Sequence, residues 1–157
     1  MRQLHWCREK VFVKRIMFTA IGTALSGLQA SSKRVEAAAS NIANSRNSIR
    51  REDAEVRGTA PAPKATDDAV YRPVRVHQET AGGGGVRSEF VPINPPHVLS
   101  YSPDDPKADA EGYVARPNVD YATEFVDMKQ AQHAYEANLR TIETEDKMIG
   151  ALLDELR

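Results

Sequence analysis

The stretch FTAIGTALSGLQASSKRVEAAASNI, residues 18–42, decides the fold of this chain, and YATEFVDMKQAQHAYEANLRTIETEDKMIGALLDEL, residues 121–156, repeats its pattern. In both, mostly apolar residues recur at alternating steps of three and four, which keeps them on one side of an α-helix. The first seam consists of Phe18, Ile21, Leu25, Leu28, Ser32, Val35, Ala39 and Ile42. The second consists of Tyr121, Phe125, Met128, Gln132, Tyr135, Leu139, Ile142, Asp146, Ile149, Leu153 and Leu156.

These two patterns predict a mainly α protein whose N- and C-terminal helices pair as a coiled coil. A seam this narrow needs a partner helix, and the obvious partner of each end is the other end. We expect helices over 17–44 and 118–157, the second beginning near Asp120 as N-cap. A second stripe, of small residues, predicts close helix approach on another face of the first helix. It consists of Ala20, Ala24, Gly27, Ser31 and Ala38.

Residues 45–117 between the helices predict a loop and a small β insert. Residues 44–69 are polar, contain two prolines and show no period, which predicts a loop. The stretches 70–80 and 86–93 flank the run Gly82-Gly83-Gly84-Gly85 and predict a β-hairpin. Val98 to Tyr101 is a candidate third extended segment, and residues 102–118 are rich in turn-forming residues.

The composition argues against a large globular core and against binding to nucleic acid or membranes through net charge. The chain has 157 residues, of which 41% are hydrophobic, 27% charged and 6% aromatic, with a net charge of -1. That balance gives no general drive toward nucleic acid or membrane. The charge is uneven, however: residues 17–51 hold five basic residues and one acidic one, and residues 118–157 hold nine acidic and four basic ones. Opposite charge favours pairing of the two ends with each other or with neighbours.

The first 16 residues have five basic side chains ahead of an apolar stretch, the layout of a signal peptide. Thr19, Gly22 and Thr23 interrupt that stretch, and its heptad continues to Ile42, beyond a cleavage site at Leu28-Gln29-Ala30. We therefore interpret residues 1–16 as a mis-called N-terminal extension, with Met17 as the true start. No run of 18 apolar residues exists, so no membrane span is expected.

No catalytic, cofactor-binding or metal-binding residue is predicted. The glycine run lacks the Gly-Lys-Ser/Thr of a phosphate loop. The histidines His5, His77, His97 and His133 are scattered without ligand spacing, and the single Cys7 excludes an internal disulfide. The basic patch Arg46, Arg50 and Arg51 fits a solvated loop better than a nucleic-acid contact, because no aromatic residues interleave with it. No small-molecule substrate is expected either.

Two groups of residues carry a family resemblance. Ala24-Leu25-Ser26-Gly27-Leu28-Gln29-Ala30, followed by Asn41-Ile42-Ala43-Asn44, resembles the N-terminal signature of bacterial flagellar rod and hook proteins. The segment Asp105 to Val119, with the helix after it, resembles the proximal-rod proteins of FlgC type. Where that family often has a Thr-Pro-Gly-Tyr-like turn, this chain has Ser45-Arg46-Asn47-Ser48. The motif residues are Ser26, Gly27, Leu28, Asn41, Ile42, Ala43, Asn44, Gly112, Tyr113, Val114, Pro117, Asn118 and Val119.

The resemblance implies a structural subunit of the flagellar basal-body rod, which spans the periplasm. It implies export by the flagellar type III apparatus without cleavage, and self-assembly with copies of the chain and with other rod subunits. The alternative is a periplasmic or membrane-surface coiled-coil adaptor unrelated to motility; an enzyme is not expected. From the heptads we expect an assembly seam of Phe18, Ile21, Leu25, Leu28, Val35, Ile42, Phe125, Met128, Tyr135, Leu139, Ile142, Ile149 and Leu153.

Overall fold

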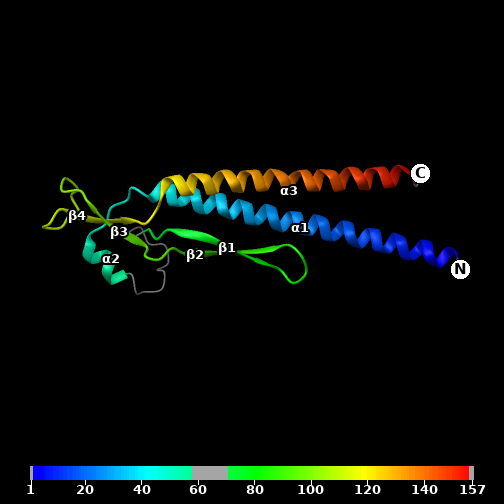
Figure 1. Cartoon of the computed structure of the whole chain (residues 1–157), viewed down its shortest axis with the longest axis horizontal. Helices are drawn as coiled ribbons and strands as arrows, with labels where there is room; N and C mark the ends of the chain where they lie inside the picture. Colours follow the sequence, from blue (N-terminus) through cyan, green and yellow to red (C-terminus); the bar gives the residue numbers. More distant parts are fainter. Residues whose placement is uncertain (1, 58–70, 156–157) are drawn as a thin grey trace. The chain divides into compact units, whose positions relative to one another are not determined.

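The computed structural model describes residues 2–57 and 71–155, with side chains from Thr19 to Ala54 and from Tyr71 to Asp154. The chain begins and ends with two long helices, α1 (Arg2–Asn44) and α3 (Tyr121–Glu155) (Figure 1). The elements between them are α2 (Arg51–Arg57), β1 (Val74–Thr80), β2 (Val86–Pro92), β3 (His97–Tyr101) and β4 (Tyr113–Pro117). The strands form two separate sheets, β1-β2 and β3-β4, so the fold is mixed α and β rather than mainly α.

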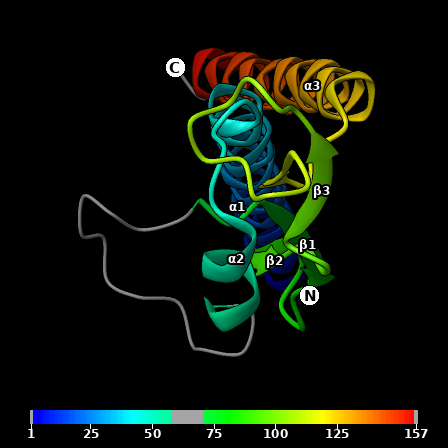
Figure 2. The same cartoon turned by 90° about the vertical axis from the view of Figure 1, so that its left-hand side faces the viewer.

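The chain forms two compact units, and both long helices contribute to each of them. Unit 1 comprises residues 1–33, 77–89 and 129–157, and unit 2 comprises residues 34–76 and 90–128. Within each unit, a segment of α1 lies between α3 on one side and a part of the β1-β2 hairpin on the other (Figure 2).

The buried face of α1 is made of small residues. Its fully buried members are Ala24, Ala30, Ser31, Ala37, Ala38 and Asn41. Small side chains let neighbouring backbones approach closely, so this face suits a helix flanked on two sides. The predicted stripe of small residues is therefore confirmed at Ala24, Ser31 and Ala38, while Ala20 is half-buried.

In unit 2, the second hairpin surrounds a small apolar centre. β3 pairs antiparallel with β4, in a register from His97 opposite Pro117 to Tyr101 opposite Tyr113. Ile49 adds a short bridge to Ala115, with N–H···O distances of 2.9 and 3.0 Å. Val114 is 0% exposed and Ala115 is 1% exposed, so the middle of β4 forms part of the core of this unit.

Several predictions about local structure are confirmed and others need correction. The first hairpin forms as expected around the glycine run, where Gly84 and Gly85 have φ angles of 93° and 88° that favour glycine. The extended segment at Val98 to Tyr101 is β3, but its partner β4 lies within 102–118, which we expected to be turns. A second hairpin therefore replaces a lone extended segment.

The helix boundaries also differ in part from expectation. α1 ends at Asn44 as predicted but begins at Arg2, although the sequence shows no period joining residues 1–16 to it. Within the predicted loop 44–69, residues 51–57 form α2, whose first turn holds Glu52 and Asp53, where the helix dipole favours acids. Residues 58–69 of that predicted loop lie outside the described residues. In the described part of the chain, no helix is long and apolar enough to span a membrane.

Candidate assembly surfaces

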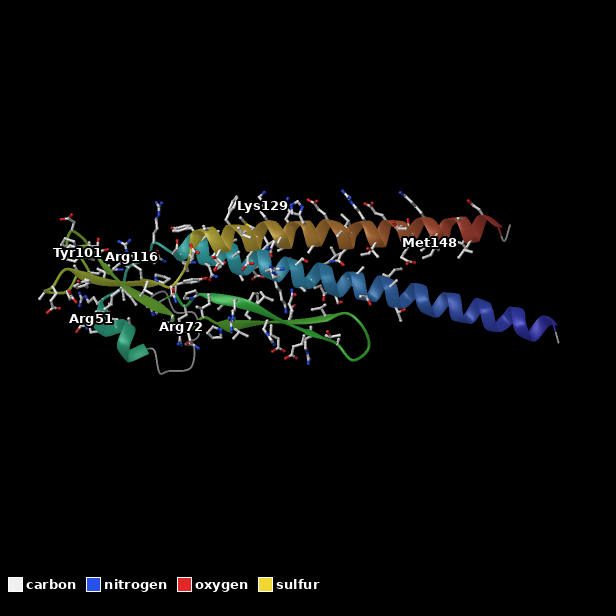
Figure 3. All side chains as sticks on the ribbon, in the orientation of Figure 1. Arg51, Arg72, Tyr101, Arg116, Lys129 and Met148 are labelled. Atoms are coloured by element: carbon white, nitrogen blue, oxygen red, sulfur yellow. The ribbon has the colours of Figure 1, made fainter. Side chains whose placement is uncertain are left out.

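Large apolar side chains lie exposed along one side of α3 in unit 1. They are Tyr135, Leu139 and Leu153, which we call the α3 stripe, and Leu139 and Leu153 are 42% and 62% exposed. Met148, seen on α3 in Figure 3, and Leu152 are exposed as well. In unit 2, α3 similarly exposes Tyr121 and Phe125, the latter at 54%. Exposed apolar side chains gathered along one side of a helix are typical of an interaction surface.

The other residues of the predicted seam are partly covered. On α3, Met128, Ile142 and Ile149 are half-buried, and on α1 the half-buried members are Ile21, Leu28, Val35 and Ile42. Leu25 is 50% exposed. The side chain of Phe18 and the whole of Leu156 lie outside what the structure describes. Among the described side chains of α1, from Thr19 onward, the fully buried ones are thus small or polar, so the larger seam residues keep accessible surface within one chain.

In unit 1, the contact between α1 and α3 depends on a glycine. The side chain of Asn138 lies over Gly27, where an added Cβ would be only 2.7 Å from Asn138 Nδ2 and Oδ1. Asn138 Nδ2 donates a hydrogen bond to Ala134 O at 2.8 Å, which holds the side chain in place. Ala131, about two helical turns before Asn138, is 0% exposed. The absent side chain of Gly27 therefore makes room for α3.

In unit 2, two polar contacts join α1 to α3, and a third joins Ser45, directly after α1, to the start of α3. Arg34 Nη2 lies 3.2 Å from Asp127 Oδ1, and Asn41 Nδ2 donates to Glu124 Oε1 at 2.7 Å. The hydroxyls of Ser45 and Tyr121 lie 2.5 Å apart. Because the α1 numbers rise while the α3 numbers fall, the helices run antiparallel. The N- and C-terminal helices are therefore packed together, but through small and polar side chains.

The motif residue Ser26 fastens the first hairpin to α1 in unit 1. Its Oγ accepts a hydrogen bond from Val86 N at 3.0 Å and donates one to Thr23 O at 2.7 Å. Gly85 has no side chain that would collide with Ser26, and its φ of 88° favours glycine. Lys33 Nζ adds a 2.6 Å bond to Ser88 O on β2. Within the motif, Ser26 thus holds the β1-β2 hairpin against one side of α1, and Gly27 makes room for α3 on another side.

The second motif ends α1. Asn44 Nδ2 donates to Ser40 O at 2.9 Å, and its Oδ1 accepts from Asn47 Nδ2 at 3.0 Å. The first bond ties Asn44 back to the last turn of α1, and the second joins it to the turn that follows the helix. Ile42 is half-buried and Ala43 is exposed.

The third motif closes the second hairpin of unit 2. Gly112 has a φ of 84°, and the rings of Tyr101 and Tyr113 meet edge to face at 5.4 Å. Tyr101 is labelled in Figure 3. Asn118 donates from its backbone N to Pro96 O at 2.9 Å and from Nδ2 to Pro95 O at 3.0 Å. Pro117 is buried, and Val119 N donates to Pro117 O at 2.9 Å.

The start of α3 shows the predicted cap and two opposite electrostatic effects. Asp120 Oδ2 accepts from Thr123 Oγ1 at 2.6 Å and Oδ1 from Ala122 N at 3.2 Å, which confirms Asp120 as the N-cap. These bonds stabilise the carboxylate and hold the pKa of Asp120 below its ordinary value. Burial instead raises the pKa of Glu124, despite the opposing hydrogen bond from Asn41.

Sequence reasoning did not find the partners of the motif residues, which lie far away in the chain. The sequence marked Glu124 as an acid near the start of the last helix, Tyr71 as part of an extended stretch and Asn138 as part of the family resemblance, but it did not indicate what they contact. The polar seam residues Gln132 and Asp146 are exposed. Arg51 of the basic patch lies 3.7 Å from Asp109, and Arg46 and Arg50 are exposed.

The residues considered for ligand binding are dispersed among the described elements. His97 Nε2 lies 3.1 Å from Tyr71 O, and burial lowers the pKa of this histidine. His77 and His133 are exposed. Among the residues the structure describes, no group of three or more His, Cys, Asp or Glu is arranged to hold a metal ion.

Comparison with known proteins finds relatives over most of the chain. Residues 21–45 match the family described as flagella basal body rod protein, and residues 110–155 match the flagellar basal body rod FlgEFG protein C-terminal family. The chain is similar to the flagellar basal-body rod protein FlgC of Salmonella typhimurium, with 35% identity over 79% of this chain and 86% of that protein. It is also similar to FlgC of Aquifex aeolicus, with 32% identity over 79% and 85% of the two chains.

Proposed function

Because this chain belongs to the FlgC family of flagellar basal-body rod proteins, we propose that its exposed helix surface is where it joins the rod. The chain is a structural subunit of the rod, which spans the periplasm, and not an enzyme. Family membership also decides against the alternative of a coiled-coil adaptor unrelated to motility. The remaining question is which surfaces make the shaft.

The α3 stripe carries the proposal. A fully buried Leu stabilises a fold or an interface by about 1.5–3 kcal/mol relative to an exposed one. Leu139 and Leu153 keep roughly half of that contribution unused within one chain, because they are 42% and 62% exposed. Packing against neighbouring subunits would recover it. Leu25 of α1, at 50% exposed, has the same surplus.

The heptad spacing of these residues suggests the form of the contact. We propose that the seams of α1 and α3 meet helices of neighbouring subunits as a coiled coil, with other rod proteins and copies of this chain as partners. Contacts of this head-to-tail kind that do not close on themselves generate a helical tube.

Folding and assembly are coupled in this proposal. Among the described side chains of α1, those that are fully buried are small or polar, and the larger seam residues of both helices are at most half-buried. Most helical stability comes from packing an apolar face, so the isolated helices are weak. The weakly held chain suits passage through the flagellar type III export apparatus in extended form. Hydrogen exchange on dilute monomer should show weak amide protection in both helices, and strong protection there would contradict this coupling.

Substitutions in the α3 stripe test the proposal directly. Leu139→Asp with Leu153→Asp should abolish rod assembly while export of the protein into the medium continues. Both side chains are exposed, so the substitutions leave the packing of the single chain in place. Electron microscopy of basal bodies and immunoblots of the medium measure the two outcomes.

Thr144→Asp is the matched control, because Thr144 is exposed and lies about 140° around α3 from Leu139, at ~100° per residue. It adds the same residue type to the same helix and should leave assembly intact. Intact basal bodies in the double variant would overturn the assignment of the stripe.

A further inference from the structure

Asn41 of α1 is a buried side chain with every hydrogen-bonding position filled. It is 1% exposed. A carboxamide offers two N–H donors and one oxygen with two acceptor positions. Nδ2 donates to Val74 O at 2.8 Å and to Glu124 Oε1 at 2.7 Å. Oδ1 accepts from Val74 N at 3.0 Å and from Tyr71 Oη at 2.7 Å. One side chain of α1 thus joins α3 to the start of β1, all within unit 2.

The orientation of this carboxamide is fixed by its partners. Val74 N can only donate and Val74 O can only accept, so Nδ2 and Oδ1 cannot be exchanged. The amide of Asn41 therefore pairs with both backbone groups of Val74, as a peptide of a neighbouring strand would. It occupies the place of a strand partner at the first residue of β1.

We infer that Asn41 is a positioning residue that couples the docking of β1 to the pairing of α1 with α3. The rotamer of Asn41 that meets Glu124 is the same one that meets Val74. Fixing a side chain in one rotamer costs conformational entropy, and here both contacts share that cost. Each contact therefore makes the other more favourable, without any direct contact between Glu124 and Val74 being required.

The coupling through Asn41 links the start of β1 to rod assembly, and this link rests on the proposed function. If the terminal helices pair firmly only in the shaft, the start of β1 is fixed only there too. Residues 71–76, around the start of β1, would then become ordered as a result of helix pairing. The same Asn belongs to the Asn-Ile-Ala-Asn motif, and this coupling gives that position a physical role.

The sharpest test removes the α3 partner and observes β1. Glu124→Ala deletes one bond of Asn41 but leaves both bonds to Val74. In subunits within isolated basal bodies, the amide of Val74 should exchange about fivefold faster in this variant, the effect of one net hydrogen bond. Asp127→Ala is the control, because it removes the contact of α3 with Arg34 and leaves Asn41 untouched. It should accelerate exchange at Val74 much less than Glu124→Ala does, because all four bonds of Asn41 remain.

A donor–acceptor reversal provides the second variant. Asn41→Asp removes both donors and places a carboxylate against that of Glu124, in a region that also holds Asp120 and Asp127. Adding Glu124→Gln lets the glutamine amide donate to the new aspartate, whose other oxygen still accepts from Val74 N and Tyr71 Oη. Val74 O still lacks its donor and faces a carboxylate oxygen of the new aspartate, so the double variant should recover part of the protection at residues 71–76 and 121–128, and part of the motility, that Asn41→Asp loses.

Two results would overturn the coupling. The first is an unchanged Val74 exchange rate in Glu124→Ala, or an equal acceleration in Asp127→Ala. The second is a double variant no better than Asn41→Asp alone. The exchange rates are read in any assembled subunit, so normal assembly of the α3-stripe variant would refute the proposed assembly surface and leave this test unaffected.

Discussion

Replacing Gly27 by alanine should weaken the rod, although alanine is the better helix former. The added Cβ would lie 2.7 Å from Asn138 Nδ2 and Oδ1 and 2.8 Å from Cγ. Ordinary contacts begin near 3.4 Å, so the side chain of Asn138 must retreat by roughly 0.7 Å. That movement breaks the 2.8 Å bond from Nδ2 to Ala134 O.

The magnitude follows from three opposing contributions. Overpacking a tight contact costs about 1–3 kcal/mol, and losing the hydrogen bond costs about 0.5–1.5 kcal/mol. Alanine returns about 1 kcal/mol of helix propensity. The net destabilisation is about 0.5–3.5 kcal/mol, and its midpoint of about 2 kcal/mol corresponds to more than tenfold in an equilibrium constant.

A competition assay measures this difference in the assembled structure. Wild-type and variant chains are produced together, and mass spectrometry of purified basal bodies gives their ratio. Gly27→Ala should be depleted more than tenfold at the midpoint of this range. Gly22→Ala is the control in the same helix, because its added Cβ meets nothing within 4 Å. It should be incorporated at parity or better. Removing the obstacle with Asn138→Ala should restore Gly27→Ala, whereas equal incorporation of the two single variants would refute the steric argument.

Three further predictions concern the hairpins and the start of α3. Gly85→Ala forces alanine to a φ of 88° and against Ser26, at a cost of about 1–2 kcal/mol, so the amide of Val86 should exchange faster. Gly83→Ala is the control, because an added Cβ meets nothing within 4 Å there, and it should not change that exchange rate. The pKa of Glu124 is raised in the folded state, so the stability that Glu124 contributes is complete below its unfolded pKa and is lost as pH rises through its folded pKa. Thermal unfolding measured between acid and neutral pH should show this decline in the wild type and not in Glu124→Gln. Val114→Ala should cost about 2 kcal/mol and increase proteolysis of unit 2, since Val114 is 0% exposed, whereas Val98→Ala, at 44% exposed, should have little effect.

The elements that sequence predicted are those with a long or distinctive local signal. Both helices were predicted because apolar residues recur every three or four positions over many turns. The first hairpin was predicted from a glycine run between two extended stretches. β4 was missed because a five-residue strand that ends in Arg116 and Pro117 carries no alternation of its own. α2 was missed because seven residues provide less than two turns of apolar period.

The choice of packing face could not be settled from one sequence. Large apolar residues dominate the pattern, yet the buried side of α1 holds alanines, Ser31 and Asn41. A stripe of leucines looks the same whether its partner is in the same chain or in a neighbour. The contacts of Ser26 with Val86 and of Asn41 with Glu124 span 60 and 83 residues, and no local pattern predicts such pairs. Resemblance marked Ser26, Gly27 and Asn41 as special, and the structure supplies the reason.

The alanine-rich face of α1 also affects how quickly the helices of an assembling subunit can pack. Alanine and glycine lose no rotamer freedom on burial, so closing this face requires only that the two backbones find each other. A core of leucine and phenylalanine would have many mispacked arrangements to sort through first. In the proposed assembly, small residues would let an incoming chain fold onto the rod quickly, and the strength of the rod would come from contacts with neighbouring subunits.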